Sequence, residues 1–316
     1  MLFSFSVAPS LGYSSYYDNV GDLYNSGEEL ELNFNLVNSK NVRWDVNMNL
    51  THLNNKITML HEDKKTSSLY DLNGNVYKGY NLSGAFVAEG LPLYTWREKE
   101  FAGVDPETGK SLWYKNTFAE DTPEGEDPAW TGVETTDDWS KADYYVTNKT
   151  AIPDLYGGLG TSFAAYGFDF AVNTSFQLGG YQYDGTYATF MSTPLASHTG
   201  ENIHVDALKA WTAENPSNEI PRWVFGDTYS AGGSTRFLTK ANYFNIENIT
   251  VGYTLPSKWT SKIKMESLRI YATAQNVWYW SARQGFDPRQ SSSNTTTNAT
   301  YYSPMRTISG GVTVRF

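Results

Sequence analysis

Histidine and carboxylate side chains are the first candidates for chemistry in this sequence, because together they can bind metal ions or move protons. His198 and His204 lie close to Asp206 in a long polar segment. Imidazole nitrogens and carboxylate oxygens are zinc ligands, but this spacing, in a chain of 316 residues without cysteine, matches no established zinc motif. We interpret these residues as solvated loop residues, and we expect no metal site and no cofactor.

Catalytic groups do not stand out from the rest of the sequence. Ser, His and Asp are all present, but no G-x-S-x-G motif places a serine for nucleophilic attack. The 34 acidic residues make accidental carboxylate pairs inevitable, so no pair is marked out for glycoside hydrolysis. Residues 71–75 (Asp-Leu-Asn-Gly-Asn) have the acid-and-amide spacing of a calcium loop but lack its terminal Glu, so a plain turn is the simpler interpretation. We expect no enzymatic activity.

Aromatic side chains in the long loops are the most informative candidates for binding. Aromatic rings stack on sugar rings, and they also anchor protein interfaces. Three roles are open to them: packing the loops against one another, contacting a partner protein, or contacting a substrate. The residues concerned are Trp130, Trp139, Tyr144, Tyr145, Trp211 and Trp223.

The strands that must position these loops are recognised by strict alternation. Residues 29–36 and 42–50 alternate apolar and polar side chains on either side of a short turn at 38–41. Successive side chains of a strand point to opposite faces, so each strand has one apolar face and one face of Glu, Asn, Arg and Asp. The second face is too polar for the interior of a β-sandwich, and it fits a water-filled lumen or plain solvent.

The last strand, residues 307–316, alternates in the same way and ends on an aromatic residue. Ile308, Val312, Val314 and Phe316 share its apolar face. A soluble domain more often ends in a few loose polar residues. We expect this face to meet lipid and the strand to seat against a partner, as in the closing seam of a barrel.

Turns and loops of very different length alternate along the chain. We count about ten strands, with short turns at 38–41 and 165–167 and long loops at 117–154, 181–240 and 281–301. Outer-membrane barrels have short periplasmic turns and long external loops. The pattern predicts an all-β fold, a transmembrane antiparallel β-barrel segment with long extracellular loops.

The composition agrees with such a barrel. Aromatic residues make up 16% of the chain, and tyrosine alone contributes 23 residues. The mean hydropathy is nevertheless −0.49, and no apolar run approaches the ~20 residues that a membrane helix needs. A membrane barrel combines both properties because only every second strand residue meets lipid, although a secreted carbohydrate-binding β protein combines them too. The net charge of −10 argues against nucleic acid as a partner.

Several motifs follow one another in order along the chain. They are Asn25–Leu32, Trp44–Asn47, Pro153-Asp154-Leu155-Tyr156-Gly157-Gly158-Leu159-Gly160, Gly167-Phe168-Asp169, Asn242–Pro256, Leu268-Arg269-Ile270-Tyr271, Gln275-Asn276 and Gly285-Phe286-Asp287-Pro288. In this order and spacing they resemble the SusC/RagA family of TonB-dependent outer-membrane transporters. The resemblance covers nearly the whole chain and is firmest over residues 150–316.

The resemblance implies a 22-stranded barrel with an N-terminal plug and a TonB box reached from the periplasm. Residues 1–316 would be the C-terminal part of such a barrel, about its last ten strands, with the plug and the TonB box absent from this chain. Met1–Phe5 has no basic region and no long apolar core, so it is not a signal peptide, and we expect the chain to be part of a longer one. Phe316 and its strand resemble the C-terminal signal read by the outer-membrane assembly machinery.

The function implied by the resemblance is import of large nutrients, either glycan oligosaccharides or peptides, through a Gram-negative, Bacteroidetes-like outer membrane. A SusD-like surface lipoprotein would lid the barrel, and the TonB complex would act through the missing plug. The alternative is a secreted β-rich glycan-binding protein or glycosidase. The two differ in the surroundings of Leu30, Leu32, Phe34 and Leu36, which a soluble protein would bury in a core and a barrel would turn towards lipid.

Overall fold

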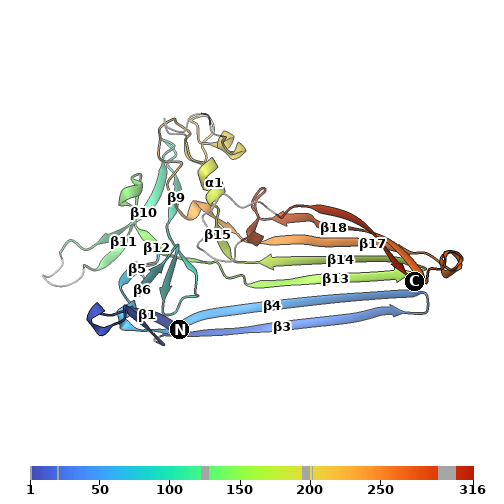
Figure 1. Cartoon of the computed structure of the whole chain (residues 1–316). Helices are drawn as coiled ribbons and strands as arrows, with labels where there is room; N and C mark the ends of the chain where they lie inside the picture. Colours follow the sequence, from blue (N-terminus) through green and yellow to red (C-terminus); the bar gives the residue numbers. More distant parts are fainter. Residues whose placement is uncertain (1, 20, 122–127, 194–199, 201, 291–303) are drawn as a thin grey trace.

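A seven-stranded antiparallel sheet is the largest element of the computed structural model, which describes residues 2–19, 21–121, 128–193, 200, 202–290 and 304–316 (Figure 1). Its order is β19-β18-β17-β14-β13-β4-β3, so these seven strands are neighbours in the sheet in the same order as in the chain. β3 and β19 form its edges. The strands are β3 (Gly21–Asn38), β4 (Val42–Leu60), β13 (Leu155–Ala165), β14 (Phe168–Leu178), β17 (Tyr243–Thr254), β18 (Ser267–Ser281) and β19 (Thr307–Arg315).

Short and long connections segregate to opposite ends of this sheet. At one end, Ser39–Asn41 joins β3 to β4, and Tyr166 and Gly167, with φ of 52° and 92°, form the tight turn between β13 and β14. The connection from β17 to β18 at the same end holds α2 (Ser257–Thr260) and η7 (Ser261–Ile263). The connections at the other end span 61–154, 179–242 and 282–306. The alternation predicted from the sequence is confirmed, and β19 runs from the long-connection end to the short-turn end.

The first long connection folds into two further sheets. A small closed barrel has the order β12-β5-β6-β7-β8, and a three-stranded sheet has the order β11-β10-β9. The barrel strands are β5 (Ser67–Tyr70), β6 (Val76–Leu82), β7 (Ala85–Ala88), β8 (Thr95–Lys99) and β12 (Tyr144–Thr150); the others are β9 (Phe101–Val104), β10 (Ser111–Phe118) and β11 (Trp130–Thr136), followed by η3 (Trp139–Lys141).

The second long connection is mostly irregular and packs beside the first. It holds β15 (Tyr181–Tyr183), α1 (Gly185–Phe190), η5 (Val205–Lys209), η6 (Thr235–Phe237) and β16 (Leu238–Lys240). Residues 61–154 and 179–242, as far as the structure describes them, are called the loop region below. The remaining short elements are β1 (Leu2–Ser6), η1 (Pro9–Leu11), β2 (Ser15–Asn19), η2 (Glu62–Lys64) and η8 (Pro288–Gln290).

The long sheet has seven strands over the described residues, rather than about ten. β1, β8, β9 and β10 also form, but they lie outside the long sheet. β8, β9 and β10 lie in the loop region: they are only four to eight residues long, β8 pairs with β7 and β12, and β9 pairs with β10. β1 pairs only with β2, in a separate two-stranded sheet.

The hydrophobic core lies in the loop region. Trp96, Trp113, Tyr145, Phe86 and Phe237 are among the largest fully buried side chains. The apolar face of the long sheet is exposed instead, with Leu30 at 46%, Phe34 at 49% and Leu36 at 51% of full exposure, and Leu32 half-buried. The arrangement required by a soluble β protein, with this face inside a core, is therefore not found. Within the described ranges, no helix combines the length and the apolar character needed to cross a membrane.

The end of β4 joins the long sheet to the loop region through its backbone. Beyond His52, where the pairing of β4 with β13 ends, the Ile57 N–H donates to the Leu91 carbonyl at 2.9 Å, and the Gly90 N–H donates to the Ile57 carbonyl at 2.9 Å. The Asn55 side-chain oxygen accepts a hydrogen bond from the Leu93 N–H at 2.6 Å. The small barrel is thus held directly by a strand of the sheet.

Candidate functional site

The two faces of the long sheet differ along whole rows of side chains. The register aligns one polar row across all seven strands, with a glycine at one position: Asn33, Asn47, Gly160, Asn173, Asn248, Gln275 and Thr307. The adjacent row, one position away on every strand, is mostly apolar: Phe34, Val46, Thr161, Val172, Ile249, Ala274 and Ile308. An amide-lined face and an apolar face therefore lie back to back across the sheet.

The polar face is tied together by side-chain hydrogen bonds. Asn173 donates to Asn248 at 3.1 Å, and Asn35 donates to Asp45 at 2.6 Å. Arg269 makes a two-point contact with Asp169, at 2.9 and 2.5 Å. Such charge-assisted pairs have well-defined geometry, so this face is polar and ordered.

The four C-terminal residues that were predicted to share an apolar face do lie on one face of the sheet edge. Ile308, Val312, Val314 and Phe316 are all exposed at the edge of the sheet. Ile308 aligns with Ala274 and Val312 with Ile270 of the neighbouring β18. Their role as an assembly signal stays a prediction.

Three of the six loop aromatics are enclosed in the packing of the loop region. Tyr145 is fully buried in the small barrel, and burial raises the pKa of its hydroxyl. Trp211 lies over Gly109, where a Cβ would come within 2.2 Å of the ring. Trp223 packs against the buried cluster that contains Met191 and Phe237.

Trp130 and Tyr144 are also engaged by neighbouring side chains. The Trp130 ring stacks on Tyr70 with the centroids 6.5 Å apart, and its Nε1–H donates to Asn116 at 2.9 Å. The guanidinium of Arg97 lies 3.7 Å from the centroid of the Tyr144 ring. Together with the three enclosed residues, they pack the loops against one another, which is the simplest of the roles considered from the sequence.

Trp139 is different, because its indole is held at its edge and remains 39% exposed. Its Nε1–H donates to the Gly233 carbonyl at 2.9 Å, and the Lys99 ammonium lies 3.9 Å from the ring centroid. Lys99 also donates to the Trp139 carbonyl at 2.5 Å, and burial lowers the pKa of this lysine. The short helix η3, which contains Trp139, is capped by Asp138: this carboxylate accepts from the Ser140 N–H at 3.0 Å and from the Ser140 hydroxyl at 2.6 Å.

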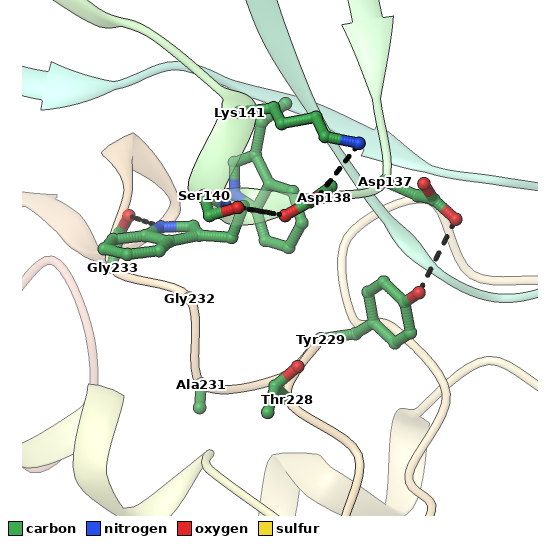
Figure 2. A pocket seen from close by; sticks show the side chains of 11 residues that line it. Asp137, Asp138, Ser140, Lys141, Thr228, Tyr229, Ala231, Gly232 and Gly233 are labelled. Carbon is green, nitrogen blue, oxygen red and sulfur yellow. Dashed lines mark hydrogen bonds and ion pairs between the residues drawn. The ribbon is translucent and has the colours of Figure 1, made fainter.

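An open cleft of about 760 Å³ lies beside Trp139 (Figure 2). Its walls come from two distant segments, residues 137–141 around η3 and residues 228–233, with Trp113 of β10 behind them. The Trp113 ring stacks on Tyr229 at 6.4 Å between centroids and 17° between planes. The lining comprises Trp113, Asp137, Asp138, Trp139, Ser140, Lys141, Thr228, Tyr229, Ala231, Gly232 and Gly233.

The two carboxylates of this cleft are both paired with lysines. Asp137 accepts a hydrogen bond from Lys110 at 2.6 Å, which holds the pKa of its carboxyl below the usual range. Asp138 lies 3.4 Å from Lys141, and its hydrogen bonds from Ser140 are the main cause of the lowered pKa of its carboxyl. Both acids are therefore ionised acceptors at neutral pH, and their charges are locally balanced.

A second cavity of about 460 Å³ in the loop region is lined by residues that include Arg236, Tyr187 and Asp206. Burial lowers the pKa of Arg236 to about 10. Asp206 accepts from Lys209 at 2.7 Å and from the Tyr187 hydroxyl at 3.2 Å, so this carboxylate already has partners.

The histidine cluster considered for metal binding has a local structural role. The His204 side chain caps η5 by accepting from the Asp206 N–H at 3.1 Å, while His198 lies outside the described residues. In the ranges that the structure describes, no group of three or more His, Asp or Glu side chains is arranged to hold a metal ion. Asp71 accepts hydrogen bonds from the N–H groups of Asn73 and Asn75 and from the Asn75 side chain, the pattern of an Asx turn.

The residues that line the cleft could not be predicted to come together from the sequence alone. Trp139 was a candidate, but Trp113, Asp137 and Tyr229 were not, because nothing local marks them. The only signal would have been the small-residue run Ala231-Gly232-Gly233, which permits close approach to the two indoles: a Cβ at Gly232 would lie 2.6 Å from Trp113 and 2.8 Å from Trp139.

No protein-family model matches the chain. Individual proteins do match it: the TonB-dependent receptor P26 of Formosa agariphila is 23% identical over 302 residues, covering 92% of this chain and 28% of the receptor. The TonB-dependent receptor SusC of Bacteroides thetaiotaomicron is 26% identical over 274 residues, covering 85% of this chain and 24% of SusC.

Solved structures agree with the sequence matches. The RagAB peptide transporter aligns with a TM-score of 0.74 at 21% identity, over 99% of this chain and 32% of the matched chain. The RagAB peptide importer in its "open-open" state aligns with a TM-score of 0.70 at 22% identity. These relatives are named receptors and transporters rather than enzymes, and the chain spans about a third of their length or less. By sequence and by fold, the chain is SusC/RagA-like and resembles a segment of a TonB-dependent receptor.

Proposed function

We propose that the chain forms the C-terminal part of the barrel wall of an outer-membrane, TonB-dependent transporter that imports large nutrients, glycan oligosaccharides or peptides. The observation that carries this proposal is the long sheet, with one exposed apolar face, one amide-lined face and segregated connections. Its strands have 9 to 19 residues, and a tilted strand needs about 9–11 residues to cross a bilayer.

In this arrangement the apolar face meets lipid and the polar face lines the lumen. The short turns lie in the periplasm, and the loop region lies outside the cell. The exposed N–H and C=O groups of β3 and β19 pair with barrel strands from the rest of a longer protein, because an unpaired edge cannot exist in hydrocarbon. The residues of this chain break and form no covalent bond during transport.

We infer two partners from the resemblance to the SusC/RagA family. A SusD-like surface lipoprotein would cover the external opening and deliver substrate. The TonB complex would pull on an N-terminal plug to open a path through the lumen. The alternative of a secreted glycan-binding protein or glycosidase is not favoured, since the apolar residues of β3 are exposed rather than packed in a core.

Cysteine accessibility tests the orientation, and the chain contributes no native cysteine. Single-cysteine variants of the full-length protein are treated with a membrane-impermeant maleimide on intact cells. Glu107→Cys, in an exposed turn of the loop region, should react on intact cells. Lys40→Cys and Lys262→Cys, at the short-turn end, should react only after the outer membrane is permeabilised. Labelling of all three on intact cells would contradict the barrel, and the reverse pattern would contradict its orientation.

A further inference from the structure

We propose that the cleft beside Trp139 is a binding subsite for a neutral oligosaccharide, located in the loop region rather than on the amide-lined face of the sheet. The role of this subsite in uptake rests on the proposed function, whereas binding itself can be tested separately. Its size of about 760 Å³ lies within the ~300–1,000 Å³ of typical small-molecule sites.

The aromatic side of the cleft is rigid before any ligand arrives. Trp139 is fixed by the Gly233 carbonyl at one edge and by the Lys99 ammonium at its face. Tyr229, which stacks on the buried ring of Trp113, forms a second aromatic wall. Aromatic side chains that are held in place bind flat apolar faces, such as the C–H face of a pyranose, with little loss of conformational entropy.

The polar side of the cleft offers carboxylate acceptors that are each paired with a lysine. Asp137 and Asp138 present ionised carboxylates, and Lys110 and Lys141 balance them at 2.6 and 3.4 Å. Carboxylate oxygens accept hydrogen bonds from pairs of hydroxyls, and the Ser140 hydroxyl adds another polar group. Hydroxyl-rich, uncharged ligands fit this set.

The same charge balance argues against a charged peptide as the occupant. A lysine side chain or peptide N-terminus would have to displace the Lys110 or Lys141 ammonium from its carboxylate. A peptide carboxylate would face two ionised acids. Neither cost applies to a neutral sugar.

Glycine at position 232 lets the 228–233 segment of the lining pack closely against both indoles. A Cβ there would lie 2.6 Å from Trp113 and 2.8 Å from Trp139, closer than packed carbon atoms approach. A larger side chain at this position would therefore displace one of the two rings.

The test uses the purified full-length protein in detergent on a glycan array of neutral glucans, mannans, xylans and galactans, with acidic uronans and a peptide array in parallel. Trp139→Ala and Asp137→Asn should each weaken binding to the best neutral glycan at least ten-fold, and Trp139→Phe should keep part of it. The matched control is Trp259→Ala, which removes an indole that is 59% exposed at the short-turn end of the sheet and should leave binding unchanged.

Neutral-glycan binding that survives Trp139→Ala and Asp137→Asn in folded protein would overturn the proposal, as would the absence of neutral-glycan binding. Peptide binding that depends on Trp139 would overturn the ligand class. If Trp139-dependent glycan binding is absent but Glu107→Cys is labelled on intact cells, only the subsite proposal fails and the transporter proposal stands. Trp139-dependent glycan binding without external labelling would instead contradict the transporter proposal alone.

Discussion

A lysine placed on either face of β17 tests the assignment of the two faces in one experiment. Ile249 and Asn248 are neighbours in the chain but belong to opposite rows of the sheet. Ile249 lies in register with Val172 and Ala274, and Asn248 with Asn173 and Gln275. The substitutions Ile249→Lys and Asn248→Lys thus add the same charge about one residue apart, one towards lipid and one towards the lumen.

The expected difference is large. A lysine on the lipid face near the middle of a membrane barrel costs about 2–4 kcal/mol of folding free energy. This corresponds to roughly a 30- to 1,000-fold change in the folding equilibrium. Asn248→Lys removes the hydrogen bond that Asn173 donates at 3.1 Å, a loss of about 1 kcal/mol.

Urea-induced unfolding of the full-length protein in lipid vesicles measures both free energies of unfolding. Ile249→Ala is the control for the lost side chain, so that only the difference between Ala and Lys reports the charge. Equal effects of the two lysines, or a greater effect of Asn248→Lys, would refute the assignment of the apolar face to lipid.

Three further predictions concern the loop region. Burial raises the pKa of Glu98 to about 7, so the folded state favours the protonated acid and the free energy of unfolding falls as pH rises from about 4.5 through 7. Glu98→Gln removes this penalty. It should slow the hydrogen exchange of β8 at pH 8, by up to about 3 kcal/mol, and have little effect at pH 5. Gly109→Ala should destabilise the packing of Trp211, since its φ is +70° and the new Cβ would meet the ring, and a lower tryptophan-detected melting temperature would show it. Chelation of divalent cations should leave that melting temperature unchanged, because both carboxylate oxygens of Asp71 already accept hydrogen bonds; a drop on adding EDTA would contradict the turn.

The wall of the barrel was predictable because its information is local. Alternation in residues 29–36 and 42–50 assigned each side chain to a face, and the observed pairs Leu30–Leu50 and Phe34–Val46 lie on the apolar one. The loop region was not predictable in the same way. Its small barrel closes where Tyr145 pairs with Tyr70, and the orientation of Trp139 depends on Gly233, so distant contacts decide both. Strands of four to eight residues leave too short a pattern to reveal such pairings.

The hydrogen bonds at the end of β4 have a mechanical consequence. A hinge needs backbone groups that are free to rotate, whereas Ile57 has both its N–H and its carbonyl bonded to residues 90–91, and the Asn55 side chain is bonded to Leu93. The loop region is therefore joined to β4 by a rigid, hydrogen-bonded connection rather than by a flexible linker. A force applied to the loop region from outside, for example by the proposed surface lipoprotein, would therefore act directly on β4 rather than being absorbed by a flexible connection.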